Sequence, residues 1–413
     1  MSSVVPEGWY ETELHQFVNV SRGYAFKSSD YRSSGNPIVR VTNITNSNKL
    51  DLTDNIVFLD ESRTKEFESY LLKNDDFLLV MVGATVGKYA EVNTKGRLLF
   101  LNQNMWRLSV HDGTNSQRFA IYGLQKVVEE FLGTMQGSAR EFLTQKDFGK
   151  APVLLPPLPE QKKIASILTS VDEVIENTQK QIDKLQDLKK ATMNELLTKG
   201  IGHTEFKDSE LGRIPKSWEV VRFGEISPQK TLGTTERGGL TDKIPLIKMG
   251  DLKFGNVIVG ANETVSKSKL IPNNFLSKGD FLFNTRNTPE LVGKVGNFNS
   301  SQLAAYDNNL LKIDFTVDIS SLFMGIQFNE LNLKRRLRRI VSGTTSVAAI
   351  YWSDLKNFYV LKPSISEQKK IYAVFESIDK QIKTLESKLA QTQSLKKSLM
   401  QDLLTGKVRV TVN

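Results

Sequence analysis

The chain has 413 residues, no cysteine and a formal net charge of +9. This length suggests two or three domains, and the lack of cysteine excludes disulfides and thiolate metal sites. No apolar run follows Met1 and no run of about 18 apolar residues occurs. The sequence therefore predicts neither a signal peptide nor a membrane span, and we expect a cytoplasmic protein. The positive charge fits a polyanionic partner as well as an ordinary basic surface, and composition alone does not choose between them.

Residues 1–155 contain short runs rich in Val, Ile, Phe and Thr, separated by Asn, Gly, Ser and Asp. Such runs predict short strands in a mostly antiparallel, curled sheet, for example at 55–59, 77–82 and 98–108. A helix is expected at 117–132. Four prolines between residues 152 and 159 close this region, which we take as the first globular domain, residues 1–155.

Within this domain, Gly83-Ala-Thr-Val-Gly87-Lys88-Tyr89 partly resembles a phosphate-binding loop. That loop needs four residues between its glycines and a Ser or Thr after its lysine. Here three residues separate the glycines and Tyr89 follows the lysine. We therefore prefer a turn that presents Lys88 to a nucleotide site.

Residues 160–197 carry an apolar seam whose steps alternate between four and three residues, which is the spacing of a coiled coil. Charged and amide residues fill the other positions, and neither Gly nor Pro interrupts the run. We assign residues 156–200 to a first spacer helix. Its seam consists of Ile164, Leu168, Val171, Ile175, Thr178, Ile182, Leu185, Thr192 and Leu196.

A second copy of this helix follows at an offset of 207 positions (367 − 160). An apolar seam needs a partner in water, so an antiparallel pair within the chain is the simplest solution; the alternative is that each helix binds another protein. We assign residues 361–407 to this second spacer helix, with a tail at 408–413, and expect Ser366 as its N-cap. Its seam consists of Ile371, Phe375, Ile378, Ile382, Leu385, Leu389, Thr392, Leu399 and Leu403.

Shorter repeats extend the duplication over the whole chain, with offsets of 204 to 209. Pro6-Glu-Gly-Trp9 recurs as Pro215-Lys-Ser-Trp218, and Gly87-Lys88 recurs as Gly293-Lys294. The polar, Gly-containing segment 201–213 is interpreted as a linker after a helix stop. Residues 214–360 form the second globular domain, with strands expected at 243–249, 279–284 and 309–315 and a helix at 322–341.

One pattern raises the question of nuclease activity. Asp147 precedes Glu160-Gln-Lys162 by 13 residues, and Asp354 precedes Glu367-Gln-Lys369 by the same distance. Nucleases that bind Mg²⁺ through Asp…Glu-x-Lys place the Glu-x-Lys on a strand, whereas both copies here begin a helix, where the dipole favours acidic residues. We therefore expect no catalytic or metal site. The histidines, which show no evident partner in the sequence, are His15, His111 and His203.

Basic and amide side chains dominate the remaining chemistry. Lys334-Arg-Arg-Leu-Arg-Arg339 places five cations in six residues. If helical, it carries charge nearly all round, and it suits phosphate binding or a solvated face that contacts another subunit. Asn102-Gln-Asn104 and Asn308-Asn309 lie in equivalent places of the two halves. Amide side chains can read adenine edges, although they also serve in turns.

Together these features resemble the specificity subunit of type I restriction-modification systems, over nearly the whole chain. The resemblance rests on the two Pro-x-x-Glu-Gln-Lys-Lys-Ile-like helix starts, on Leu-Leu-Thr at both helix ends, and on Lys207-Asp-Ser-Glu-Leu-Gly-Arg-Ile-Pro-Lys-Ser-Trp218 between the halves. It implies an α+β fold: two similar, mostly antiparallel target recognition domains separated by two long antiparallel coiled-coil helices, in a pseudo-twofold arrangement.

The resemblance also implies a function. Such a chain would be non-catalytic and would bind double-stranded DNA at a bipartite site, with one domain per half-site. It would scaffold two methyltransferase subunits and recruit restriction/translocase subunits. S-adenosylmethionine, ATP and Mg²⁺ would belong to these partners, with no cofactor in this chain. Two alternatives stay open, namely a protein-binding coiled-coil adaptor without DNA recognition and a nuclease.

Within the domains, the resemblance implies that the strand piece around Arg40, the Gly-Lys turns and the Gly-Ser or Gly-Thr loops face DNA. The second-copy turn, Arg286 to Gly293, is two residues longer than the first, so its geometry is expected to differ. The expected DNA contacts are Arg40, Asn43, Lys88, Asn102, Gln103, Asn104, Ser138, Arg140, Lys248, Arg286, Lys294, Asn308, Asn309, Thr344, Thr345, Lys334, Arg335, Arg336, Arg338 and Arg339.

Overall fold

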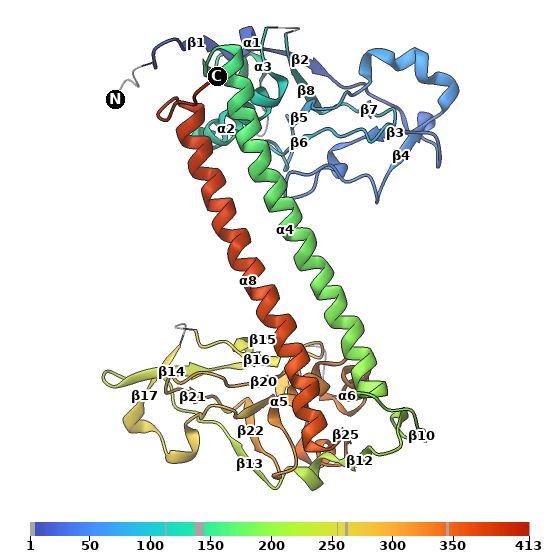
Figure 1. The fold of residues 1–413 in the computed structure, drawn as a ribbon, viewed down its shortest axis with the longest axis vertical. Coiled ribbons are helices and arrows are strands. Elements are labelled where there is room, and N and C mark those ends of the chain that lie inside the picture. Colours follow the sequence, from blue (N-terminus) through green and yellow to red (C-terminus); the bar gives the residue numbers. More distant parts are fainter. Residues whose placement is uncertain are drawn as a thin grey trace. The chain divides into compact units, whose positions relative to one another are not determined.

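The computed structural model describes residues 5–111, 114–135, 144–253, 255–260, 263–343 and 347–412. The chain divides into two compact units: unit 1 comprises Met1–Gln179 with Ser387–Asn413, and unit 2 comprises Lys180–Glu386. Two long helices, α4 (Leu158–Lys199) and α8 (Ile365–Leu404), contribute a segment to each unit (Figure 1). No described helix is both long and apolar enough to cross a membrane.

Unit 1 contains three small sheets beside its segments of α4 and α8. Its strands are β1 (Tyr10–Glu13), β2 (Val18–Arg22), β3 (Asn36–Val39), β4 (Val57–Leu59), β5 (Phe77–Val80), β6 (Tyr89–Glu91), β7 (Phe100–Leu101), β8 (Met105–Val110) and β9 (Pro152–Leu155). Its other helices are α1 (Leu14–Phe17), α2 (Gln117–Met135) and α3 (Gln145–Gly149), with 3₁₀ segments at Ser28–Asp30, Val41–Asn43 and Glu61–Tyr70. The sheets have the orders β1-β9, β2-β8-β5-β6 and β4-β3-β7.

Unit 2 is built in the same way. Its strands are β10 (Phe206–Ser209), β11 (Gly212–Pro215), β12 (Glu219–Arg222), β13 (Gln229–Leu232), β14 (Lys243–Ile247), β15 (Leu252–Lys253), β16 (Gly255–Val257), β17 (Thr264–Ser266), β18 (Phe281–Asn284), β19 (Arg286–Asn287), β20 (Val295–Asn297), β21 (Ala305–Tyr306), β22 (Leu310–Asp314), β23 (Ser342–Gly343), β24 (Ala348–Ala349) and β25 (Tyr359–Lys362). Its short helices are α5 (Ser321–Asn329), α6 (Leu331–Leu337) and α7 (Trp352–Leu355), with 3₁₀ segments at Phe223–Ile226, Met249–Asp251, Lys267–Lys269, Pro272–Asn274 and Arg338–Ile340.

The two units share one strand topology. The pair β1-β9 corresponds to β12-β25, the sheet β2-β8-β5-β6 to β13-β22-β18-β20, and the sheet β4-β3-β7 to β17-β14-β21. The paired strands of the described residues are antiparallel apart from β3-β7, β14-β21 and β16-β20. The predicted α+β fold with two similar, mostly antiparallel globular regions is thereby confirmed.

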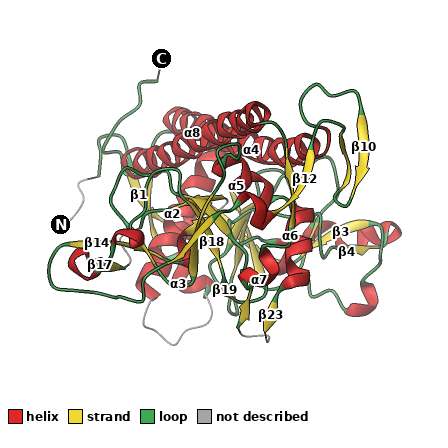
Figure 2. Cartoon of the chain, turned by 90° about the horizontal axis from the view of Figure 1, so that it is seen from below, coloured by secondary structure: helices red, strands yellow, loops and turns green. Residues whose placement is uncertain are grey.

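The central strands explain why the predicted runs are continuously apolar. All four residues of β5 and all four of β18 are buried, because each strand has a neighbour on both edges and packed layers on both faces. In unit 2, α5 lies between the sheet that contains β18 and the long helices (Figure 2). The core of each unit therefore joins its main sheet to its helices.

The helix expected at 322–341 is broken in the structure. α5 ends at Asn329, and α6 begins at Leu331 with Glu330 as its N-cap, whose carboxylate accepts hydrogen bonds from the backbone N–H groups of Asn332 and Leu333. A side chain that captures these two N–H groups starts a new helix. Apolar periodicity runs through the break, so the sequence pattern did not reveal it.

The predicted coiled-coil seam is present in both long helices. In unit 1, the start of α4 packs against the end of α8, so the two segments are antiparallel: Ile164 and Leu168 share a core with Leu403. In unit 2, the end of α4 packs likewise against the start of α8, where Leu197 shares a core with Ile371. The antiparallel helix pair is therefore confirmed.

A lysine occupies the one gap in each apolar seam. Lys189 lies between Leu185 and Thr192, at the position where the four-three spacing expects an apolar residue, and its Nζ is 2.5 Å from Asp379 of α8. In unit 1 the equivalent Lys396 lies 2.7 Å from Asp172. A polar pair in an apolar seam favours one register, since any shift would leave the ammonium group unpaired.

The repeated Trp and Glu residues bind each other. In unit 1, Glu160 accepts a hydrogen bond from Trp9 Nε1 at 3.0 Å and two from Arg409, at 2.8 and 2.9 Å. In unit 2, Glu367 accepts one from Trp218 Nε1 at 2.9 Å and lies 2.8 Å from His203 Nε2. Both glutamates lie in the first turn of a long helix, as predicted, and each links that helix to the entry of a globular region.

The glutamine after each glutamate makes a second repeated link. Gln161 Oε1 accepts from the backbone N–H of Ser116, and Gln368 Oε1 accepts from that of Ser320, both at 2.8 Å. These serines precede α2 and α5. The Glu-Gln pair therefore ties each long helix to two other elements, which explains why both residues recur. No group of three or more His, Cys, Asp or Glu side chains among the described residues could hold a metal ion.

Replacing Glu160 by Gln is expected to destabilise unit 1 in a pH-dependent way. Burial alone would raise the pKa of Glu160, but hydrogen bonds from Arg409 and Trp9 outweigh burial and hold the pKa below the ordinary 4.5. A lowered carboxyl pKa contributes stability above pH 4.5, and this contribution is lost as the pH falls through the folded-state value. We expect a Tm about 3–5 °C lower at pH 7, and a difference that disappears in acid.

The control is Glu130→Gln, because Glu130 is an exposed carboxylate on α2 with a single i,i+4 ion pair to Lys126. It should leave the Tm unchanged at every pH. Thermal unfolding followed by circular dichroism between pH 3 and pH 8 distinguishes the two. Equal behaviour of both variants would contradict the structural role of Glu160.

The end of α4 matches its predicted helix stop, whereas the start of α8 differs from the prediction. Gly200 ends α4 in the left-handed conformation (φ +64°) and its N–H bonds to Leu196, so the predicted helix stop is present. The cap of α8 is Ser364, whose hydroxyl accepts from the backbone N–H of Glu367, and the expectation of Ser366 was wrong. The segment between α4 and β12 contains the hairpin β10–β11, which the linker interpretation did not include.

Candidate nucleic-acid interface

A short polar turn joins two strands in unit 1, and we call Asn102–Asn104 the first polar turn. It connects β7 to β8 and is held by backbone bonds from Tyr24 N–H to Leu101 at 2.9 Å and from Gln103 N–H to Tyr24 at 2.8 Å. A Cβ on Gly23 would lie 1.9 Å from the carbonyl oxygen of Asn102, so only glycine permits this close approach. The side chains of Gln103 and Asn104 are exposed.

Unit 2 repeats this turn with different side chains, and we call Asp307–Asn309 the second polar turn. Its backbone bonds run from Thr234 N–H to Tyr306 at 2.9 Å and from Asn308 N–H to Thr234 at 3.0 Å. Gly233 again allows the approach, since a Cβ there would lie 2.3 Å from Asp307 O. Equivalent backbone bonds thus present Gln103 and Asn104 in one unit, and Asn308 and Asn309 in the other.

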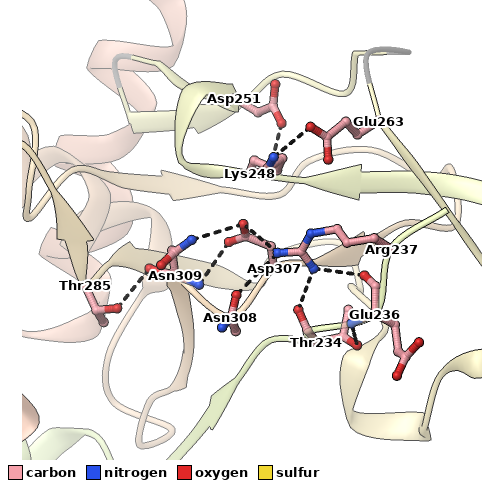
Figure 3. A network of polar contacts seen from close by, with 10 residues as sticks. All are labelled: Thr234, Glu236, Arg237, Lys248, Asp251, Glu263, Thr285, Asp307, Asn308 and Asn309. Carbon is pink, nitrogen blue, oxygen red and sulfur yellow. Dashed lines mark hydrogen bonds and ion pairs between the residues drawn. The ribbon is translucent and has the colours of Figure 1, made fainter.

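A polar network fixes the side chains of the second polar turn (Figure 3). Asp307 is fully buried and accepts from Asn309 Nδ2 at 3.3 Å and from Arg237 Nη2 at 3.4 Å. Arg237 also donates to the backbone oxygens of Thr234 and Glu236, and its Nη2 lies 3.3 Å from Asn308 Oδ1. The guanidinium therefore orients the amide of Asn308, with its nitrogen left as a donor.

The first polar turn is held by an aromatic side chain instead. Asn102 is 6% exposed and donates from Nδ2 to Tyr31 Oη at 3.2 Å. The guanidinium of Arg40 lies 5.7 Å from the centre of the Tyr31 ring. Neither Tyr31 nor Arg237 was predicted from the sequence, and neither contact recurs among the described residues of the opposite unit.

Arg40 and Lys248 follow the strands that lie beside the two polar turns. β3 pairs in parallel with β7, and β14 with β21, so the residue after each first strand meets the start of a turn. Arg40 N–H donates to Asn43 Oδ1 at 2.9 Å, and Lys248 N–H donates to Asp251 Oδ2 at 2.8 Å. Asn43 is buried in this backbone role, which leaves it little surface for another contact.

The two Gly-Lys turns also share their backbone geometry. Val80 N–H donates to Lys88 O, and Asn284 N–H donates to Lys294 O, both at 2.8 Å. Lys88 Nζ donates to Asn46 Oδ1 at 2.6 Å, so it lies against the loop that follows Arg40. A strand follows Lys88, in agreement with a turn and unlike the helix that follows a phosphate-binding loop.

The basic cluster 334–339 is anchored by two buried leucines, Leu333 and Leu337, so it has an apolar face, contrary to the expectation of charge all round. Arg336 lies 4.6 Å from the Phe358 ring and donates to Tyr359 O at 2.9 Å, which is a packing role. Burial, followed by the charge of Lys294, lowers the pKa of Lys334, so these two predicted contacts lie close together. Apart from Lys334, the exposed cations of the cluster are Arg335, Arg338 and Arg339.

The remaining expected contacts divide into two groups. Arg286 is exposed on β19, directly after Thr285, which bonds to the backbone of Asn309 in Figure 3. It therefore adjoins the second polar turn. Ser138, Arg140, Thr344 and Thr345 lie outside the described residues. All the expected DNA contacts stay predictions.

Comparison with known proteins identifies relatives of the chain. The family "Type I restriction modification DNA specificity domain" matches residues 6–187. The putative type I restriction enzyme MjaX specificity subunit of Methanocaldococcus jannaschii is 28% identical, over 98% of this chain and 95% of its own length. The type I restriction enzyme EcoKI specificity subunit of Escherichia coli is 22% identical, over 98% of this chain and 90% of its own length.

Solved structures share the fold. The S subunit of a type I restriction-modification system from M. genitalium superposes with a TM-score of 0.59 at 14% identity, over 100% of this chain and 98% of its own. A chain from a study of complex assembly in a type I restriction-modification system gives a TM-score of 0.58 at 15% identity, over 98% of this chain and 100% of its own. Sequence and fold agree: the chain is similar over nearly its whole length to type I restriction-modification specificity subunits, and it shares their fold.

Proposed function

We propose that this chain is the non-catalytic, sequence-specific DNA-binding subunit of a type I restriction-modification complex, and that each unit reads one half of a bipartite site. The observation that carries the proposal is the repeated polar turn. Equivalent backbone hydrogen bonds present Gln103 and Asn104 in unit 1, and Asn308 and Asn309 in unit 2. Two readers with one backbone geometry and different side chains suit two different half-sites.

The charged residues support a division of labour within each unit. Arginine and lysine side chains bind phosphates and fix position, whereas amides and arginines at base edges carry sequence preference. The exposed arginines Arg335, Arg338 and Arg339, together with Lys294, suit phosphate binding. The polar turns, with Arg40, Lys248 and Arg286 beside them, suit contacts to base edges.

The proposed partners follow from the similarity to type I specificity subunits. DNA and the other subunits of the restriction-modification complex are the chain's partners, and we propose two methyltransferase subunits and the restriction/translocase subunits. S-adenosylmethionine, ATP and Mg²⁺ are expected to bind to these partners. The adaptor alternative, a coiled coil that binds proteins only, predicts no DNA affinity and is tested by the same experiment.

The isolated chain is expected to bind duplex DNA with an affinity that falls steeply with salt. Proteins that make six to ten phosphate contacts lose about 10³–10⁵ in affinity between 50 and 200 mM salt, through counterion release. Fluorescence anisotropy with random duplex DNA over this range measures the slope of log affinity against log salt. A flat response would contradict phosphate contacts, and absence of binding at low salt would favour the adaptor.

Removing two cations of the basic cluster tests its part in this binding. Arg338→Gln/Arg339→Gln is expected to reduce the salt slope by about 2, because each lost phosphate contact removes about one unit. The control is Lys207→Gln/Lys216→Gln in the β10–β11 hairpin, which removes the same charge from exposed positions. Equal slopes for both variants would exclude the cluster from the interface.

A further inference from the structure

A cleft of about 940 Å³ lies within unit 2, between the six-stranded sheet, α5 and the long helices. Asparagines line its sheet and α5 side, where Gly255 and Gly325 also expose backbone. Aromatic, aliphatic and charged side chains of the long helices line the other side. The asparagines are Asn256, Asn297, Asn299 and Asn329, and the residues from α8 include Tyr372, Phe375, Glu376, Asp379, Lys380 and Lys383.

Asn297 is the unusual member of this lining. Its side chain is 2% exposed, and its Nδ2 is buried without a hydrogen-bond partner among the described residues. Burying an amide donor without an acceptor is unfavourable, because the group loses its hydrogen bonds to water, so such groups are rare in folded proteins and indicate an absent partner. Asn297 therefore indicates a missing acceptor at this cleft.

Unit 1 fills the same place with its own side chains. Glu91 pairs with Phe77 across its sheet as Asn297 pairs with Phe281, so Glu91 and Asn297 are equivalent. Glu91 forms an ion pair with Arg118 of α2, and Arg118 Nε lies 3.3 Å from Thr169 Oγ1 on α4. Arg118 thus bridges the sheet to the long helix.

The equivalents of this bridge in unit 2 all line the cleft. The hydroxyls of Ser116 and Ser320 each accept a hydrogen bond from the backbone N–H three residues later in the chain, at 3.3 Å. Because this cap is shared, Ser116 corresponds to Ser320, and Arg118 to Leu322. The offset of the long helices aligns Thr169 with Glu376. Leu322 and Glu376 are cleft residues, like Asn297. Unit 2 therefore has an opening where unit 1 has a bridge.

A second bridge of unit 1 is also absent from unit 2. In unit 1, Tyr122 of α2 donates from Oη to Asp172 Oδ2 at 2.8 Å. The equivalent residues in unit 2 are Ile326 and Asp379, and both line the cleft. Ile326 has no polar group to donate to Asp379, which keeps only the lysine pair that both units share, Lys189–Asp379 in unit 2 and Lys396–Asp172 in unit 1. Both internal links of unit 1 are thus replaced by open space in unit 2.

We propose that this cleft binds an uncharged peptide segment of the methyltransferase subunit, an inference that rests on the proposed function for the identity of its partner. Carboxamides complement peptide groups, and a backbone carbonyl would supply the acceptor that Asn297 lacks. Leu322, Ile326 and Phe375 offer an apolar wall for one side chain of the segment. The location, against α4 and α8, suits a subunit that assembles along these helices.

The charges of the lining argue against DNA as the occupant. Lys189 is neutralised by Asp379. The two further lysines, Lys380 and Lys383, are exposed and share the rim with Glu376. A phosphate backbone requires several free cations, whereas this lining has a surplus of one, with three lysines against two carboxylates. A neutral polypeptide meets no such requirement.

Unit 1 provides the side chains for a variant that would close the cleft in unit 2. Asn297→Glu/Leu322→Arg copies the Glu91–Arg118 pair into unit 2 and closes the cleft with residues that unit 1 already uses in this position. In the full-length chain, we expect the affinity for the purified methyltransferase subunit, measured by isothermal titration calorimetry, to fall at least tenfold. DNA binding of the isolated variant, measured by anisotropy, should be unchanged.

The matched control is Gln302→Glu/Val317→Arg, which makes the same charge change at exposed positions outside the cleft. It should bind the methyltransferase subunit like the unsubstituted chain. Unchanged affinity in a folded closing variant overturns the proposal while leaving the proposed function intact. Failure of the unsubstituted chain to bind either DNA or the methyltransferase subunit would instead remove the proposed function.

A second measurement covers the case in which the closing variant does not fold. A photo-crosslinking amino acid at Ile258, a cleft residue that is 49% exposed, is irradiated in the assembled complex with DNA. We expect a crosslink to one methyltransferase peptide, identified by mass spectrometry. A crosslink to DNA alone, or to no partner, overturns the proposal.

Discussion

Exchanging residues 1–155 for the corresponding domain of another specificity subunit is expected to replace one half of the methylated motif and to leave the other half unchanged. Each unit has its own sheet core and its own polar turn, so each can bind its half-site independently. The donor domain must keep a tryptophan at the position of Trp9, because Glu160 otherwise loses a buried hydrogen bond. Mapping of methylated positions in cells that carry the chimaera measures the result.

The reciprocal exchange of residues 214–360 is the control, and it should change only the other half of the motif. Loss of methylation by a folded, assembled chimaera, or a change in both halves at once, would contradict independent reading. The proposed boundaries, 155 and 214, are themselves tested, since a boundary inside a core would give an unfolded chain. Circular dichroism of the purified chimaera distinguishes misfolding from altered specificity.

Lengthening both long helices by four residues is expected to lengthen the recognised spacer by one or two base pairs without changing the half-sites. Four helical residues add roughly 6 Å at about 1.5 Å each, and a base pair rises about 3.4 Å. Four residues also approximately preserve the seam, with some local unwinding. The insertions belong after residues 180 and 387, where one unit gives way to the other, so that neither lysine–aspartate pair is shifted.

The control insertion is made in α4 alone. It should lower the stability of the folded protein, because α4 is then lengthened without α8 and the two lysine–aspartate pairs of the seam cannot both form. Methylation mapping reads out the spacer of the double insertion. A folded, active double variant that keeps the original spacer would restrict the helices to subunit binding.

The sequence revealed most of the architecture, because the fold depends on patterns that repeat. The four-three seam, the buried runs at residues 77–80 and 281–284, and the paired offsets each reflect one physical constraint, the burial of apolar faces. The seam lysines were missed for the same reason: Lys189 and Lys396 obey the spacing but not the polarity. Their aspartate partners become visible only when the helices are paired.

The candidate interface was less predictable, because the side chains that hold the polar turns in place differ between the two units. The polar turns could be found from their asparagines, but Tyr31 and Arg237 lie in loops that differ between the units. The burial of Asn102 and Asn43 depends on contacts from distant segments. The recurrence of Trp9 and Trp218 beside the recurrence of Glu160 and Glu367 was a usable signal, since residues that repeat together often touch.

The close approach at Gly23 and Gly233 has a consequence for how target sites diverge in evolution. Glycine and main-chain hydrogen bonds hold each polar turn in place, and the exposed side chains at 103 and 104 add little to the packing. Substitutions of Gln103 therefore change the chemistry of the surface at little thermodynamic cost, whereas Asn104, whose φ is +71°, is restricted to residues that tolerate the left-handed region. Under the proposed function, a lineage can therefore change its DNA preference through substitutions at position 103, without first passing through an unstable ancestor.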